Sequence, residues 1–119
     1  MHELSVCQAL VDQLEALGKE QQAIRVVKLL VGIGPLSGVE PALLGQAFPL
    51  AAAGTLAEDA ELIIEDRPVR VHCRQCGRDS DASANRLLCD HCGDWRTELL
   101  SGDELMLIQV EFMRERAYV

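Results

Sequence analysis

The sequence is poor in aromatic side chains, in basic charge and in long apolar runs, and each shortage excludes a class of function. Aromatic residues make up 3 % of the 119 positions, so nucleic-acid bases have no platform on which to stack. Eleven basic against nineteen acidic residues give a formal net charge of −8, which repels a phosphate backbone. No apolar stretch approaches the ~20 residues of a membrane-spanning helix. We therefore expect a protein that neither binds nucleic acid nor crosses a membrane.

The beginning of the chain also lacks the pattern of a secretion signal. Met1-His2-Glu3-Leu4-Ser5 has no basic segment followed by an apolar run, so we expect a cytoplasmic protein. The cytoplasm keeps thiols reduced, and the five cysteines of the chain are therefore more typical of metal binding than of a disulfide framework. Four of them occur in two spaced pairs, and Cys7 is left over.

Hydrophobic periodicity predicts two helices and three main strands. Apolar residues at steps of three and four indicate an amphipathic helix that ends near Gly18. The expected helices are residues 4–17 and about 40–53, and the expected strands are 24–31, 61–67 and 104–113. This pattern predicts an α+β fold, in which two helices pack on a small, about three-stranded sheet with an inserted zinc-ribbon module.

Two features of the second helix can be read from local sequence. Ser37 and Glu40 have the spacing of a capping box, but Glu40 and Pro41 could equally be the cap and the first position of the helix. Pro49 lacks an amide donor and crowds the preceding turn, which predicts a kink near Phe48.

Charge separates one segment from the rest of the chain. Residues 1–68 carry a net charge of −6 and residues 101–119 a net charge of −2, whereas residues 69–100 are neutral. We therefore predict an α/β domain formed by residues 1–68 plus 101–119, with residues 69–100 inserted as a separate zinc-binding domain.

The strongest motif in this insert is a pair of C-x-x-C-G units, twelve residues apart. Each unit directs two thiolates to one point, and two units complete a tetrahedral four-sulfur cage of the kind that holds structural Zn(II). Iron in the same cage, a histidine in place of one cysteine, and disulfides are the alternatives. His72 and His91 adjoin the cysteines but are not needed to complete the tetrahedron. The predicted zinc ligands are Cys73, Cys76, Cys89 and Cys92.

The first three residues offer a different set of donors. A terminal amine, backbone amide nitrogens and the His2 imidazole can form fused chelate rings, and planar nitrogen-rich sites suit Ni(II) or Cu(II). On chemistry alone, a solvated His2 is the more common case.

Several motifs together resemble one protein family. The Met1-His2-Glu3-Leu4-Ser5 start, the Val31-Gly32-Ile33-Gly34 turn followed by Ser37, and the two C-x-x-C units are similar to the HypA/HybF family of hydrogenase nickel-incorporation proteins. The resemblance covers nearly the whole chain. It implies a nickel metallochaperone in which His2 and the N-terminal backbone, including the Met1 amine, bind Ni(II). Glu3 would tune the site or supply a ligand, and Glu40 would be an auxiliary ligand or a neighbour of the ligands.

The same resemblance implies the partners. They would be the nickel-handling GTPase HypB and the precursor of the [NiFe] hydrogenase large subunit, and some family members also serve urease. We expect a monomer or a weak homodimer, and Cys7 on the apolar stripe of the first helix is expected to be buried rather than a ligand.

Two other functional classes compete with this interpretation. Paired C-x-x-C units also occur in zinc ribbons that bind nucleic acid or the transcription machinery, but the five arginines of the insert are balanced by five acidic residues. An enzyme is the third class. We predict no catalysis, because the chain offers no open histidine-rich site and no phosphate-binding loop.

Overall fold

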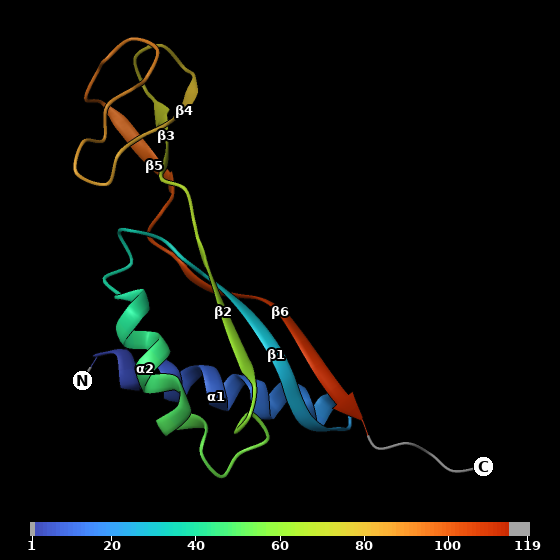
Figure 1. Cartoon of the computed structure of the whole chain (residues 1–119). Coiled ribbons are helices and arrows are strands. Elements are labelled where there is room, and N and C mark those ends of the chain that lie inside the picture. The colour runs from blue at the N-terminus through green and yellow to red at the C-terminus, as the bar shows by residue number, and fades with distance from the viewer. Residues whose placement is uncertain (1, 115–119) are drawn as a thin grey trace. The chain divides into compact units, whose positions relative to one another are not determined.

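The structure, a computed structural model, describes residues 2–114 of the chain and the side chains of residues 3–114. The described part contains the following helices and strands: α1 (His2–Glu20), β1 (Ala23–Ile33), α2 (Pro41–Ala52), β2 (Glu61–Asp66), β3 (Arg70–Cys73), β4 (Asp79–Asp81), β5 (Thr97–Ser101) and β6 (Leu105–Arg114) (Figure 1). Neither of these helices is long and apolar enough to span a bilayer. The predicted α+β class is confirmed.

The chain divides into two compact units. The first consists of the described residues within Met1–Val31, Val39–Ile64 and Leu107–Val119, and the second of Gly32–Gly38 and Glu65–Met106. The predicted insert, residues 69–100, falls inside the second unit.

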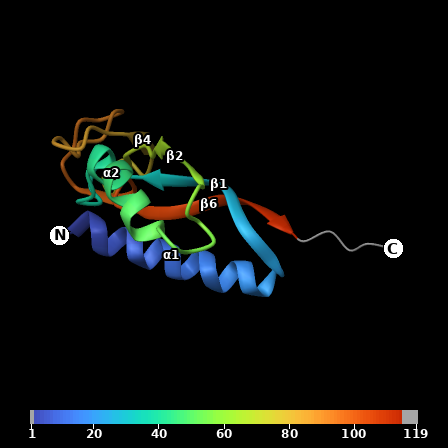
Figure 2. The same cartoon turned by 60° about the horizontal axis from the view of Figure 1, so that its bottom comes forward.

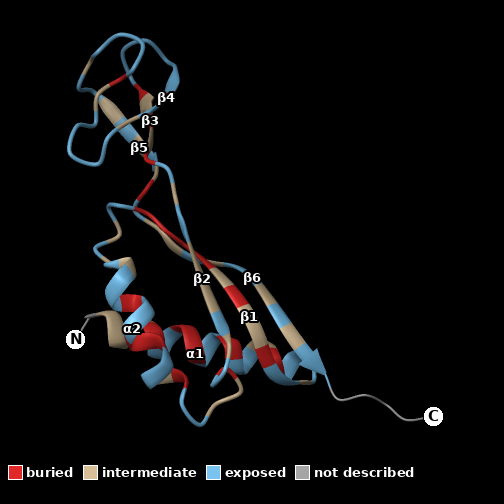
Figure 3. Cartoon of the chain, viewed as in Figure 1, coloured by how far each residue is buried: buried red, intermediate tan, exposed pale blue. Residues whose placement is uncertain are grey.

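Helix α1 is amphipathic, and its apolar stripe forms much of the core of the first unit. The side chains of Cys7, Leu10, Val11 and Leu14 are all buried (Figure 3). The helix was predicted to end near Gly18 and continues two residues further, to Glu20. A Cβ atom at Gly18 would lie 2.6 Å from Leu56 Cδ1, so the glycine there permits close packing instead of terminating the helix.

Helix α2 begins as in the second predicted alternative, with Glu40 as the cap and Pro41 as the first helical residue. Glu40 is the N-cap, in an extended conformation (φ −86°, ψ 115°), and Pro41 follows in the first turn. The Glu40 side chain makes no capping hydrogen bond. The helix continues through Pro49 to Ala52, so the proline for which a kink near Phe48 was predicted does not end the helix. Since Pro49 lies in the last turn, its missing N–H removes only one helical hydrogen bond.

The first sheet has the strand order β2-β1-β6, with the long β1 in the centre. Helix α1 runs alongside this sheet in both views (Figures 1 and 2). The buried side chains of β1 are Val26, Leu29, Val31 and Ile33. The three predicted strands are therefore confirmed to within two residues at each end.

The second sheet belongs to the second unit and has the antiparallel order β4-β3-β5. Arg70 pairs with Asp81 and His72 with Asp79 across β3 and β4. The side chains of each pair also form a hydrogen bond of 2.6 Å, so the side-chain contacts and the register agree. This small sheet carries the first C-x-x-C unit at the end of β3.

Two glycines allow two backbones of the second unit to approach closely. A Cβ atom at Gly34 would collide with the backbone carbonyl of Gly102, which itself has φ +117°. The Leu36 amide donates to the Gly102 carbonyl at 2.7 Å, and the Gly34 amide donates to Glu104 O at 2.8 Å.

Candidate metal sites

The two C-x-x-C-G units have the same backbone geometry. In the first, the Gly77 amide donates to Cys73 O at 2.9 Å, and in the second the Gly93 amide donates to Cys89 O at 2.8 Å. Both glycines adopt a left-handed conformation, with φ 77° and 75°. The glycine of each motif therefore closes the turn in a conformation that other residues rarely adopt.

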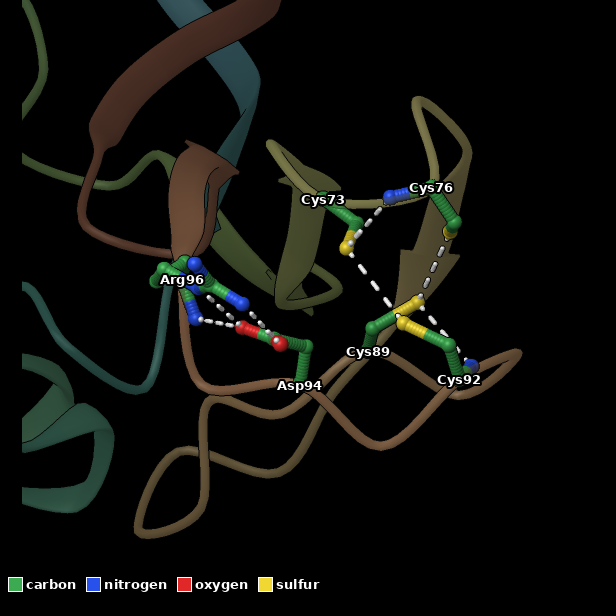
Figure 4. A network of polar contacts seen from close by, with 6 residues as sticks. All are labelled: Cys73, Cys76, Cys89, Cys92, Asp94 and Arg96. Atoms are coloured by element: carbon green, nitrogen blue, oxygen red, sulfur yellow. Dashed lines mark hydrogen bonds and ion pairs between the residues drawn. The ribbon is translucent and has the colours of Figure 1, made fainter.

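The closed turns bring the four thiols together (Figure 4). The sulfurs of Cys73 and Cys92 lie 3.6 Å apart, and those of Cys76 and Cys89 are also 3.6 Å apart. All four lie within 4.8 Å of one another. A tetrahedral ion with metal–sulfur bonds of ~2.3 Å separates its sulfurs by about 3.8 Å, so the group fits such an ion. All four cysteines are free thiols, which excludes the disulfide alternative for this structure.

Backbone amides point at the sulfurs and favour the thiolate form. The Cys76 amide donates to Cys73 Sγ at 3.4 Å, and the amides of His91 and Cys92 donate to Cys89 Sγ at 3.4 and 3.5 Å. The hydrogen bond from the Cys92 amide, with that from His91, lowers the pKa of Cys89 to about 6 against the opposing effect of burial. One sulfur of the group is therefore easily ionised.

The sulfurs of Cys76 and Cys92 cannot ionise as easily beside it, because the pKa of each thiol is raised. The Asp94 amide acts to lower the pKa of Cys92, but burial and the neighbouring thiols outweigh it and raise that pKa to about 12. Four thiolates within this distance repel one another unless a cation lies between them. The donor set, its spacing and its electrostatics thus define a metal-binding group.

A charged pair beside the second C-x-x-C-G motif, Cys89 to Gly93, was not predicted from the sequence. Asp94 accepts three hydrogen bonds from Arg96, from the backbone amide at 2.7 Å, from Nε at 3.0 Å and from Nη2 at 2.9 Å. The side-chain hydrogen bond to Arg96 is the main cause that lowers the pKa of Asp94 to about 2. The Arg96 carbonyl also accepts the Arg74 amide at 2.9 Å, which ties this turn to the first C-x-x-C unit. The D-x-R spacing directly after the second C-x-x-C-G unit is the signal that could have revealed it.

The two histidines of the insert are not part of the thiol group. His72 is engaged with Asp79 through Nδ1 at 2.6 Å, and the metal-binding group among the described residues contains only the four cysteines.

The second candidate site lies at the start of α1. Met1 and the His2 side chain lie outside the described residues, so their predicted roles rest on the sequence. The structure brings Glu3 and Glu40 together, because the Glu40 amide donates to Glu3 Oε2 at 3.4 Å. Cys7, one turn further along α1, is fully buried as predicted and its thiol donates to Leu44 O at 3.5 Å.

Fold and site together define a small α+β protein with a four-thiol metal-binding module. The family profile described as "Hydrogenase/urease nickel incorporation, metallochaperone, hypA" matches residues 1–112. The chain therefore belongs to the HypA family of nickel-incorporation metallochaperones.

Individual relatives agree with this assignment. The chain is 45 % identical over 113 residues to the hydrogenase maturation factor HypA of Nitrosospira multiformis, an alignment that covers 95 % of this chain and 98 % of the relative. It is 41 % identical over 111 residues to the HypA of Aquifex aeolicus, covering 93 % and 96 %. The solution structure of the nickel metallochaperone HypA from Helicobacter pylori is similar with a TM-score of 0.73 at 28 % identity, covering 95 % of this chain and 98 % of that one.

Proposed function

We propose that this protein binds Ni(II) at its N-terminus and delivers it for the maturation of a [NiFe] hydrogenase. The observation that carries the proposal is the family match, which begins at residue 1 and runs through the C-x-x-C units to residue 112. The proposed nickel donors are the Met1 amine, the His2 imidazole and neighbouring backbone nitrogens, because such a set forms the planar site that Ni(II) favours. Glu3 and Glu40 are the acidic residues beside this site.

The four cysteines have a different role in this proposal. They hold Zn(II), and the sulfur–sulfur distances of 3.6 Å support a closed tetrahedral site. Four protein ligands leave no open coordination position, so the zinc stabilises the second unit and does not catalyse a reaction. Nickel is cargo, and its transfer requires only the exchange of ligands.

The proposed partners follow from the family. The relatives are hydrogenase maturation factors, and we propose that this chain likewise works in the cytoplasm with the GTPase HypB and the hydrogenase large-subunit precursor. The net charge of −8 supports metal cations, and not nucleic acid, as ligands.

The nickel site can be tested by calorimetry. Ni(II) is titrated into the zinc-loaded protein, into His2→Ala and into a variant extended by two residues at the N-terminus. The proposal expects one equivalent of nickel to bind the native protein and binding to be lost in both variants. If all three proteins bind nickel alike, the ion lies elsewhere and the proposed N-terminal site is wrong.

A further inference from the structure

The carboxylate of Glu3 lies at the N-terminus of α2 as well as in the first turn of its own helix. In a capping box, an acidic side chain at the third helical position accepts the amide of the N-cap residue. In α2 this third position is Leu43, and the first turn carries no acidic residue. Glu3 of α1 fills the role instead, since its Oε2 accepts the Glu40 amide at 3.4 Å.

A second contact lies one turn further along both helices. Cys7 follows Glu3 by one turn of α1, Leu44 follows Glu40 by one turn of α2, and the buried Cys7 thiol donates to Leu44 O at 3.5 Å. The Leu44 amide in turn donates to Glu40 O at 2.9 Å, which is the first backbone hydrogen bond of α2. Consecutive turns of the two helices are therefore joined in register. A movement of the Glu3 carboxylate removes one of the hydrogen bonds at the start of α2.

The conformation of the first turn of α1 conflicts with nickel binding. The backbone is helical from His2 onward, and helical N–H groups point along the axis, roughly parallel to one another. A planar site made of the terminal amine and successive backbone nitrogens needs these atoms to converge on one ion. The same backbone cannot satisfy both geometries, so nickel binding at this site opens the first turn and displaces Glu3.

We propose that Glu3 is a positioning residue that couples nickel binding to α2. In the nickel-free protein its carboxylate holds the Glu40 amide, and nickel binding by the N-terminal nitrogens releases it. The coupling rests on the proposed nickel function, but the role of Glu3 in the nickel-free protein does not.

Amide hydrogen exchange at Leu44 provides a local measure of this coupling. Experiments use the full-length, zinc-loaded protein, labelled for NMR. In Glu3→Ala the Leu44 amide is expected to exchange about threefold to tenfold faster than in the native protein, as the loss of a capping contact implies. Asp12→Ala removes an exposed carboxylate from the middle of α1 and should leave Leu44 unchanged. An unchanged Leu44 amide in Glu3→Ala would overturn the proposal.

The contact itself can be tested by removing the donor. Glu40→Pro deletes the amide, and the native φ of −86° is close to the value that proline requires. Glu40→Ala keeps the amide and removes only the side chain. Adding Glu3→Ala should accelerate Leu44 exchange in the Glu40→Ala protein but not in the Glu40→Pro protein. Equal acceleration in both would show that Glu3 does not act through this amide.

The nickel step is tested by adding one equivalent of Ni(II). The native protein should show the same increase in Leu44 exchange as Glu3→Ala, and His2→Ala should show none. If calorimetry finds N-terminal nickel binding but Leu44 does not respond, the coupling is wrong and the proposed function stands. If calorimetry finds no nickel at the N-terminus, the proposed function fails, and the Glu3→Ala result alone decides the capping role.

Discussion

The sulfur of Cys73 lies 3.6 Å from that of Cys92, although the two residues belong to different C-x-x-C units. Each C-x-x-C motif therefore contributes sulfurs to one shared cage, and the loss of one sulfur should prevent the cage from holding its metal. With zinc as the metal proposed for this group, we predict that Cys73→Ser loses the metal and that the second compact unit unfolds, because the binding energy of a structural zinc site is folding energy. Metal analysis and the dispersion of amide NMR signals from residues 65–106 measure both effects.

The matched control for this experiment is Cys7→Ala. It also removes one buried cysteine, but from the core of the first unit. This variant should keep its zinc and the NMR signals of the second unit. Full zinc retention by Cys73→Ser would refute the four-sulfur site.

The ion pair between Asp94 and Arg96 should slow the release of the zinc proposed for the four-cysteine group. It braces the backbone that follows Cys92, so Asp94→Asn should lose zinc to a chelator faster, by about twofold to fivefold, the modest effect typical of an exposed pair. Because the pKa of Asp94 is lowered to about 2, the carboxylate is charged throughout the neutral range and the effect should be equal at pH 6 and pH 8. The control is Asp90→Asn, which also removes one negative charge from the second compact unit. This variant should release zinc at the native rate.

The thiol of Cys7 should be unreactive in the folded protein. Burial, with a smaller effect from the Glu3 charge, raises the pKa of Cys7 above its ordinary value of 9.0. The thiolate is the reactive species, so iodoacetamide should not label Cys7 at pH 8 until denaturant is added. Peptide mass mapping of the zinc-loaded protein measures this directly.

The same pKa shift predicts a dependence of stability on pH. The raised pKa means that the folded state holds this proton more tightly than the unfolded chain does. The contribution of the protonated Cys7 thiol to the free energy of unfolding is therefore fully present below pH 9. It is lost as the pH rises through the pKa of Cys7 in the folded state. Cys7→Ala should lack this part of the alkaline loss of stability, and an identical alkaline profile would contradict the assignment.

Two glycine-to-alanine substitutions should change the stability of the protein in opposite directions. Gly34→Ala places a Cβ atom against the Gly102 carbonyl, which should destabilise the protein by about 1–3 kcal/mol. Gly45 lies inside α2 with open space around its Cα, so Gly45→Ala should stabilise it by about 0.5–1 kcal/mol. Thermal unfolding of the two variants measures the difference, and a Gly34→Ala protein as stable as the native one would disprove the close approach.

Features written in local spacing could be predicted from the sequence. The C-x-x-C-G spacing alone determines the turn that aligns Cys73 with Cys76, and periodicity alone identifies the apolar stripe of α1. A start of α2 near residue 40 could also be predicted, with Pro41 as first helical residue as one of two alternatives, because a proline fits the first turn for reasons confined to its own ring.

Features that depend on distant contacts could not be predicted. Gly18 looked like a helix end, but the helix continues to Glu20, and the side chain that packs closely against Gly18 belongs to the distant Leu56. The strand order β2-β1-β6 depends on the packing of the whole unit. The contact between Glu3 and Glu40 joins residues 37 positions apart, so no local pattern reveals it, and only the family resemblance placed both residues near one site.

The most direct test of the account is X-ray absorption at the nickel and zinc edges of one sample loaded with an equivalent of each metal. We predict nickel surrounded by nitrogen and oxygen only, and zinc surrounded by four sulfurs at ~2.3 Å. Thiolate sulfur bound to nickel, or nitrogen and oxygen ligands in place of sulfur around zinc, would contradict the assignment of separate nickel and zinc sites.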